Sequence, residues 1–318
     1  MAIIKTADLA AFAARTVNLP HDEAQAGRDR VKILRARMEK HIADNPGFSL
    51  VKMLHAGSVA KGTALATVND LDVVVYVRAD DVPETGLVSW MAQRLRDAYG
   101  KTINPDQVEE GVHCPTITFA SGLSVDVVPV LYEGDDDDVG YLIAKDTGDR
   151  LKTSVTQHLA FIRARKNATP DHFAQMVRFV KWWVRTQKKL DSDFKFKSFM
   201  AELIVAKLAD EGVDMADYPE ALARVFSFIV DSGFRERIAF TDYYPASDLP
   251  GTTGAVMEIF DPVNPDNNVS FRYTDTDRLR IVNAAERALD AITEADYATT
   301  KGEAVVCWQV VLGTRFKG

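Results

Sequence analysis

Near the start of the chain, apolar residues recur every three or four positions between charged ones. They are Val31, Leu34, Met38 and Ile42. That spacing places them on one face of a helix, so the pattern predicts an amphipathic helix over residues 28–42. The Asn45-Pro46-Gly47 segment is expected to end it. The earlier segment MAIIKTADLAAFAAR is interrupted by charges and is predicted to begin a helix, because a signal peptide needs an unbroken apolar centre.

Runs rich in β-branched residues come next and predict strands. LDVVVYV at 71–77 is almost continuously apolar, as in a strand that is buried on both faces. Shorter strands are predicted over 49–54, 116–120 and 123–132, and the last two are joined by a link of hairpin length, Ser121-Gly122. Helical spacing returns over 87–99.

From about residue 156 the pattern is mainly helical. Three helices are marked by apolar positions at helical spacing: Phe173, Met176, Val177, Val180 and Val184; Phe199, Leu203, Ala206 and Leu208; Val282, Ala285, Leu289 and Ile292. The sequence therefore predicts an α+β protein with two domains, a mixed sheet with helices over 1–155 and a helical lobe over 156–318. An active-site cleft is expected between them.

Charge and composition narrow the classes of protein that fit. The chain of 318 residues has 38 Lys and Arg against 46 Asp and Glu, a net charge of −8. This acidic balance disfavours a protein coated with nucleic acid but leaves room for a local basic pocket. Two distant cysteines give no disulfide framework or zinc spacing, and no segment is apolar enough for a membrane span. We expect a cytoplasmic protein.

Four adjacent aspartates, 135–138, interrupt the pattern after residue 132. Like charges repel one another, so the run favours a solvated loop. Binding of a divalent cation is the less favoured interpretation, because calcium loops alternate their ligands with other residues.

The most informative segment is HAGSVAKGTALATVNDLDVVVYV, from 55 to 77. Gly57 permits a turn that a Cβ atom would block and exposes backbone amides toward a phosphate. Ser58 adds a hydroxyl donor beside it. A Gly-Ser pair alone is weak evidence, and the argument depends on the carboxylates that follow.

Asp70 and Asp72 stand two apart at the start of the apolar strand, so both side chains point to the same side. Asp126 in LSVDVVPV is a further aspartate within an apolar strand, and its neighbours Val125 and Val127 point to the opposite face. Buried like charges are costly unless a cation neutralises them. Oxygen ligands suit Mg²⁺ or Mn²⁺, and three such carboxylates can hold two ions that activate a hydroxyl and hold a triphosphate. Alternatively, an Asp-x-Asp pair opening a strand is only a capped turn.

Taken together, GSVAKGTALATVNDLDVVVYV and Asp126 resemble the polymerase-β-type nucleotidyltransferases, in the branch of oligoadenylate synthetase and cGAS. The chain is most similar to the bacterial cGAS/DncV-like nucleotidyltransferases, the CD-NTases of anti-phage CBASS systems, and within them to clade C (CdnC). The likeness extends over further motifs: TVNLP, VDVVPVLY, HFAQMVRFVKWW, FKSFMAELI, YPEAL and DPVNPDNNV. It implies a polymerase-β-like core fused to a helical lobe like that of oligoadenylate synthetase.

The resemblance assigns nucleotide-binding roles to further residues. Lys181 matches a helix lysine that grips the triphosphate, and Ser198 and Phe199 match a Ser-Tyr pair that binds triphosphate and stacks on the base. Lys61 matches a lysine that contacts acceptor phosphates. From the residues alone, Lys181 is a solvated residue beside an apolar stripe, Ser198 a helix N-cap and Phe199 a core residue.

The implied reaction joins ATP into a cyclic oligonucleotide, with cyclic tri-AMP as the product that clade C suggests, and releases pyrophosphate. Asp70, Asp72 and Asp126 would hold two Mg²⁺ ions, and Asp126 would accept the hydroxyl proton. Implied partners are nucleotide substrates, a HORMA-domain activator and an AAA+ remodelling ATPase. Duplex DNA is a candidate regulator at Lys188, Lys189, Lys195 and Lys197.

Three other functions stay open at this point. The first is a transferase of the same fold that modifies RNA, a protein or a small molecule. The second is an inactive signalling scaffold, and the third is a nucleic-acid-binding module. The turn-rich loop DPVNPDNN at 261–268 is expected to have a structural role, with reading of a base edge as the alternative.

Overall fold

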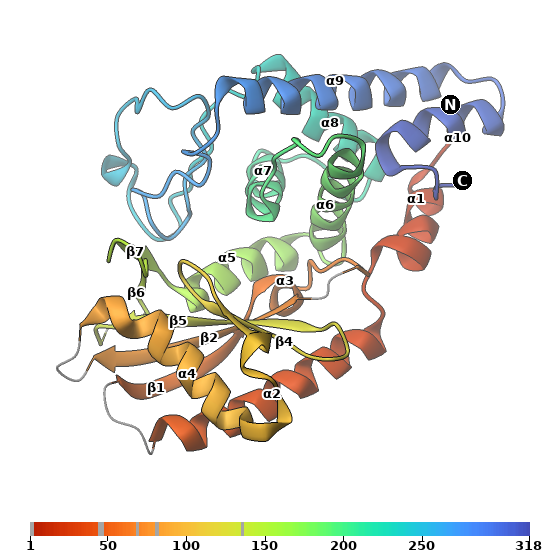
Figure 1. The fold of residues 1–318 in the computed structure, drawn as a ribbon. Helices are drawn as coiled ribbons and strands as arrows, with labels where there is room; N and C mark the ends of the chain where they lie inside the picture. Colours follow the sequence, from red (N-terminus) through yellow and green to blue (C-terminus); the bar gives the residue numbers. More distant parts are fainter. Residues whose placement is uncertain (1–2, 44–47, 68–69, 80–82, 135–136) are drawn as a thin grey trace. The chain divides into compact units, whose positions relative to one another are not determined.

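The computed structural model describes residues 3–43, 48–67, 70–79, 83–134 and 137–318 (Figure 1). Its internal contacts divide the chain into two compact units, which we call the sheet unit (19–160) and the helical unit (1–18 and 161–318). The predicted division near residue 155 is close to the observed one. Residues 1–18 are the exception, because they pack with the helical unit and not with the sheet.

The sheet unit is built on a mixed seven-stranded sheet. Its strands are β1 (Phe48–Ala56), β2 (Asp70–Ala79), β3 (Val108–Glu110), β4 (Pro115–Thr118), β5 (Ser124–Tyr132), β6 (Gly140–Ile143) and β7 (Arg150–Thr153). The main path runs β1-β2-β5-β4-β3, while β6 pairs with both β5 and β7. Strands β2 and β5 are parallel, and the other pairs are antiparallel. The predicted strands at 49–54 and 71–77 are confirmed as parts of β1 and β2. Those predicted at 116–120 and 123–132 correspond to β4 and β5, but β4 ends at Thr118 and β5 begins at Ser124.

Two amphipathic helices cover one face of this sheet, α2 (His21–Ala43) and α4 (Leu87–Tyr99) (Figure 1). The predicted stripe of α2 is buried in the core against Leu71, Val73 and Val127. The helix predicted over 87–99 has those bounds in the structure. The segment expected to end α2, 45–47, lies outside the described residues.

The opposite face of β2 and β5 has a smaller apolar cluster, formed by Ala56, Val74, Tyr76 and Val130. Alternation along β2 places Asp70 and Asp72 on this face with Val74, and alternation along β5 places Asp126 there with Val130. The aspartates therefore lie on the sheet face away from α2 and α4, as the alternation predicts.

The helical unit comprises α1 (Thr6–Phe12), a π-helical turn (Ala13–Val17), most of α5 (Val155–Ala168), α6 (His172–Leu190), α7 (Ser198–Asp210), α8 (Tyr218–Asp231), α9 (Asp275–Tyr297) and α10 (Lys301–Leu312). Helix α6 is central, since it contacts α7, α8 and α10 and buries both tryptophans of RFVKWW. Helix α9 runs along α8 and α10 (Figure 1). The three sets of apolar residues used to predict helices lie on α6, α7 and α9.

The N-terminal helix is fixed to the helical unit by aromatic packing. Phe12 is 2% exposed, and its ring meets those of Trp182 at 6.0 Å and Phe316 at 5.4 Å. The hydroxyl of Thr6 donates to the carbonyl of Ala216 at 3.2 Å. These contacts explain why residues 1–18 do not belong to the sheet unit.

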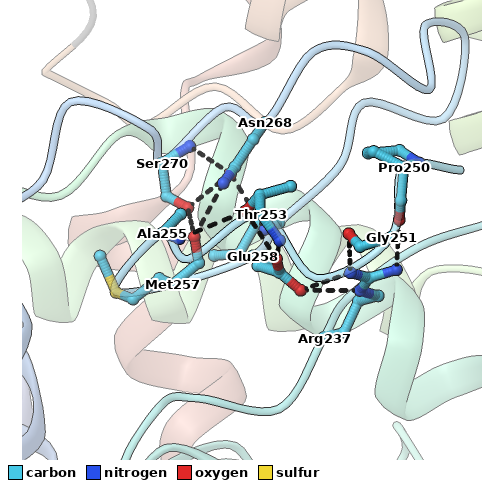
Figure 2. A network of polar contacts seen from close by, with 10 residues as sticks. Arg237, Pro250, Gly251, Thr253, Ala255, Met257, Glu258, Asn268 and Ser270 are labelled. Carbon is cyan, nitrogen blue, oxygen red and sulfur yellow. Dashed lines mark hydrogen bonds and ion pairs between the residues drawn. The ribbon is translucent and has the colours of Figure 1, made fainter.

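A long irregular segment between α8 and α9 is held together by side chains that bond to backbone groups (Figure 2). Arg237 donates to Glu258 and to the carbonyls of Pro250 and Gly251. Within the predicted loop, Asn268 accepts from the amide of Ile259 at 3.1 Å and donates to the carbonyl of Met257 at 2.8 Å.

The first aspartate of that loop, Asp261, is only 4% exposed and has a similar role. Its carboxylate accepts from the amide of Val263 at 2.9 Å and from the side chain of Asn267 at 3.1 Å. These bonds confirm the structural role expected for DPVNPDNN.

The described part of the acidic run differs from a plain solvated loop. Asp138 is half-buried, forms an ion pair with Lys52 and accepts from the hydroxyl of Thr156 at 2.6 Å. Asp137 is exposed, and its carbonyl accepts from Ser154 at 2.7 Å. The prediction of a solvated loop is therefore wrong for Asp138. In the chain as described, no helix is both long and apolar enough to cross a membrane.

Candidate active site

The parallel pairing of β2 with β5 brings two of the predicted aspartates side by side. Asp72 and Asp126 are direct Cα partners in this register. Paired residues of neighbouring strands point to the same face, so the two half-buried carboxylates are close neighbours on the face away from α2 and α4. Like charges on directly paired residues repel each other, and a cation beside them would reduce that repulsion.

Gly57 is packed directly against Asp72 of this pair. It opens the short helix α3 (Gly57–Lys61) with a φ of +68°. A Cβ atom at this position would lie 1.6 Å from Oδ2 of Asp72. Both the backbone conformation and the contact require glycine, as the sequence predicts for the turn.

The β4–β5 hairpin adds a hydrogen bond to the pair. The hydroxyl of Thr116 donates to Oδ1 of Asp126 at 2.6 Å, and the two residues are Cα partners. The amide of Phe119 donates to the carbonyl of Leu123, and the amide of Gly122 donates to the carbonyl of Phe119. The hairpin loop therefore contains Ala120 in addition to Ser121 and Gly122. Gly122 has a φ of +80°, as a three-residue hairpin loop requires.

Cys114 lies near the same carboxylates. Burial, followed by the negative charges of Asp126 and Asp72, raises the pKa of its thiol to about 12. The thiol is therefore protonated and neutral near pH 7, and it adds no negative charge to the site.

Asp70 shares the face of Asp72 but is exposed and stands opposite Ser124. Across the described residues, no three His, Cys, Asp or Glu side chains are gathered in a group that could hold a metal ion. The structure thus pairs Asp72 with Asp126 and leaves Asp70 on the same face outside a three-residue group. Two adjacent carboxylates beside a glycine backbone still suit a hard divalent cation, whose preferred ligands are oxygens.

Ser58 and Lys61, two further predicted nucleotide-binding residues, belong to α3 and are half-buried. The carbonyl of Ser58 accepts from the amide of Thr63 at 2.8 Å and closes the helix, while Gly62 ends it with a φ of +71°. Val59 packs into the core of the sheet unit. These contacts fix α3 beside Asp72.

Lys181 is buried, contrary to its interpretation as a solvated residue. Its side chain is 5% exposed, and its Nζ forms an ion pair at 2.7 Å with Oε1 of Glu202, whose side chain is 4% exposed. Residues Lys181 and Glu202 lie on the facing helices α6 and α7. The apolar stripe does not reveal this contact, because the partner is 21 residues away.

Ser198 is the first residue of α7, and Lys197 is the N-cap. The prediction that Ser198 caps the helix is therefore wrong by one position. Phe199 is half-buried and lies outside the buried core, so its interpretation as a core residue is also wrong. An exposed serine followed by a partly exposed aromatic ring is compatible with the nucleotide-binding roles that the resemblance assigns.

The lysines considered for DNA binding are partly engaged within the helical unit. Lys188 and Lys189 are exposed at the end of α6. Lys195 pairs with Asp277 at 3.3 Å, and Lys197 donates to the carbonyl of Val269 at 2.7 Å. Burial lowers the pKa of Lys197, and the charge of Arg272 lowers it further.

Sequence reasoning does not single out three residues near the predicted ones: Thr116, Cys114 and Glu202. Thr116 faces Asp126 only in the register of a three-residue hairpin loop. Glu202 interrupts the apolar run of α7, and an acidic residue at a buried position is the one anomaly that points to it.

Comparison with known proteins identifies relatives of this chain. No protein-family model matches the chain. A cyclic AMP-AMP-AMP synthase of Escherichia coli strain MS 115-1 is 48% identical over 313 residues, which cover 98% of this chain and 97% of that protein. A CBASS oligonucleotide cyclase CdnC of E. coli strain KTE188 is 28% identical over 96% of this chain and 95% of its own length.

Solved structures show the same fold. The chain superposes on E. coli MS115-1 CdnC, from its complex with HORMA-deltaN, with a TM-score of 0.90 and 47% identity over 99% of each chain. Vibrio cholerae DncV, a cyclic AMP-GMP synthase, gives a TM-score of 0.71 at 13% identity over 96% of this chain and 93% of DncV. At that identity DncV supports the α+β fold alone.

Proposed function

Because the chain belongs to the CD-NTase family of CBASS nucleotidyltransferases, we propose that it joins three ATP molecules into cyclic tri-AMP and releases three pyrophosphates. In each step a ribose hydroxyl oxygen bonds to the α-phosphorus of ATP, the bond to pyrophosphate breaks, and the hydroxyl proton passes to a base. The observation that carries the proposal is the Asp72–Asp126 pair, with Gly57 packed against Asp72, in a chain 48% identical to a cyclic AMP-AMP-AMP synthase.

Asp72, Asp126 and Asp70 are the residues proposed to hold Mg²⁺. Bound Mg²⁺ would supply positive charge against the triphosphate and the developing negative charge at phosphorus. Thr116 fixes one oxygen of Asp126, so the other oxygen is oriented for a ligand or for the hydroxyl proton.

In the helical unit, Lys181 and Ser198 are proposed to bind the triphosphate and Phe199 to stack on the base. Ser58, Gly57 and Lys61 of the sheet unit would contact phosphate groups. The half-buried ring of Phe199 has a face for stacking but lacks the hydroxyl of a tyrosine, so it adds no hydrogen bond to the base.

Regulation by protein partners follows from the same family. The solved CdnC:HORMA-deltaN complex supports a HORMA-domain protein as a partner of this chain, and we propose that this partner is its activator. An AAA+ remodelling ATPase and duplex DNA are further proposed regulators, and the proposed place of action is the cytoplasm.

The deciding experiment is product analysis by mass spectrometry after incubation with each NTP and Mg²⁺. It is done alone, with a HORMA-domain protein and with duplex DNA, and nuclease digestion assigns the linkages. We expect cyclic tri-AMP from ATP. In the Asp70→Asn/Asp72→Asn variant, the rate should fall by at least about a thousandfold with an unchanged melting temperature.

Asp106→Asn, which changes an exposed aspartate of the same unit, is the matched control and should keep full activity. Full activity in the double variant would contradict the metal site. A labelled nucleotide that appears only on added RNA, protein or antibiotic would indicate a transferase with another acceptor.

A further inference from the structure

One ion pair in the helical unit has both of its side chains buried. Lys181 on α6 and Glu202 on α7 are 6% and 3% exposed. The π-helical turn at 13–17 and helices α7, α8 and α10 pack against α6, and their other charged side chains are exposed or half-exposed. Glu202 is therefore the buried carboxylate that faces α6. The nearest charged neighbours of Lys181 on its own helix are the cations Arg178 and Arg185.

A buried ion pair of this kind is not expected to stabilise the fold more than apolar side chains would. Removing two charges from water costs several kcal/mol per ion, and apolar residues of similar size are often as stable. A lysine side chain also loses about 2 kcal/mol of rotamer entropy when it is fixed. An ion pair retained at this place is better explained by a need for a fixed ammonium group.

The position of Glu202 connects the pair to Ser198. The two residues are four positions apart on α7, so they lie on one face of the helix, and helical side chains lean toward the N-terminal turn. The Glu202 carboxylate therefore leans toward the turn that begins with Ser198. The ammonium it holds lies on the same side of α7 as that serine.

We infer that Glu202 is a positioning residue, which holds the Lys181 ammonium in place for the triphosphate of ATP. This inference depends on the triphosphate role proposed above for Lys181. Glu202 itself acts through Lys181 and not on the nucleotide, so its removal should weaken recognition of the triphosphate and spare recognition of the base and ribose.

The test compares the affinities of ATP and adenosine, measured by calorimetry or by ligand-observed NMR. Glu202→Gln keeps the size and a hydrogen-bond acceptor but removes the charge. We expect its Kd for ATP to rise about tenfold and its Kd for adenosine to stay within about twofold. In a Lys181→Met background the same substitution should add less than about twofold, because the residues act as one unit.

Two controls separate positioning from a structural role. Glu211→Gln removes the carboxylate that pairs with Lys207 just after α7 and should leave both affinities unchanged. Glu202→Asp keeps the charge and should bind ATP with most of the affinity of the unmodified protein. This variant also provides the test if Glu202→Gln does not fold. Equal losses for ATP and adenosine, tighter ATP binding, or additive effects with Lys181→Met would overturn the inference.

Product analysis of the unmodified protein distinguishes this inference from the proposed function. If it makes no cyclic nucleotide, the proposed function fails while the ATP and adenosine affinities still test Glu202. If it makes the product and Glu202→Gln binds ATP normally, the inference about Glu202 alone fails.

Discussion

Gly57 is the position where one added methyl group should have the largest effect on the site. Gly57→Ala places a Cβ atom 1.6 Å from the Asp72 carboxylate and imposes a positive φ on alanine. We expect the free energy of unfolding to fall by about 1–3 kcal/mol and nucleotide transfer to fall by more than tenfold, because Asp72 must move. Urea unfolding and initial rates measure the two effects.

Gly212→Ala is the control for backbone strain alone. Gly212 also has a positive φ, +85°, but a Cβ atom there meets nothing within 4 Å. It should lose stability without losing the activity of the folded protein. If the two variants keep equal activity, the contact with Asp72 does not shape the site.

At single positions, the sequence is most informative where a residue type is anomalous for its surroundings. Aspartates inside apolar strands indicated Asp72 and Asp126 correctly as neighbours on one face. Lys181 was not predictable in this way, since its burial depends on Glu202, which another helix supplies. The cap of α7 is displaced by one residue from Ser198, because helix ends are decided by backbone geometry as well as by side-chain preference.

The β4–β5 hairpin supports the site through its register. A two-residue link would pair Asp126 with Ile117, whereas the observed loop places it opposite Thr116. Thr116→Val removes the 2.6 Å hydrogen bond to Asp126 and nearly keeps the side-chain shape. We expect kcat to fall by about three- to tenfold, equivalent to the loss of a hydrogen bond with a net contribution of about 1 kcal/mol, with a small change in melting temperature.

Thr118→Val is the matched control on the same strand. Thr118 is exposed and lies two residues away on the same face, and its hydroxyl bonds to the hydroxyl of Ser124 at 3.0 Å. It should retain the kcat of the unmodified protein. A similar loss of kcat in both variants would point to the hairpin as a whole and not to the bond with Asp126.

Elements with a strong period were predictable, while short or irregular ones were not. Helix α4 has the bounds predicted from its apolar spacing, and the nearly continuous apolar run over 71–77 lies within strand β2. Strands β3, β6 and β7 span only three or four residues, too few for a periodic signal. The segment shown in Figure 2 depends on side-chain bonds such as those of Arg237, which no local pattern encodes.

At the scale of the whole chain, the division into units does not follow sequence order. The first 18 residues belong with 161–318, although the sequence places them beside the sheet. Packing of Phe12 on Trp182 and Phe316 accounts for this, since an aromatic side chain buries a large apolar area. A contact between residues about 170 positions apart lies beyond any window in which periodicity is read.

Because residues 1–18 belong to the helical unit, truncating the side chain of Phe12 should destabilise that unit selectively. Phe12→Ala should cost about 3–5 kcal/mol, and hydrogen exchange should accelerate in α6 and α10 while β2 keeps its protection. Phe48→Ala is the counterpart in the sheet unit, where Phe48 is 3% exposed and packs on Trp90; it should accelerate exchange in β1 and β2 and spare α6. Hydrogen exchange followed by mass spectrometry resolves both effects by peptide. If Phe12→Ala loosens β2 as much as α6, the two units unfold as one, and residues 1–18 stabilise the whole chain.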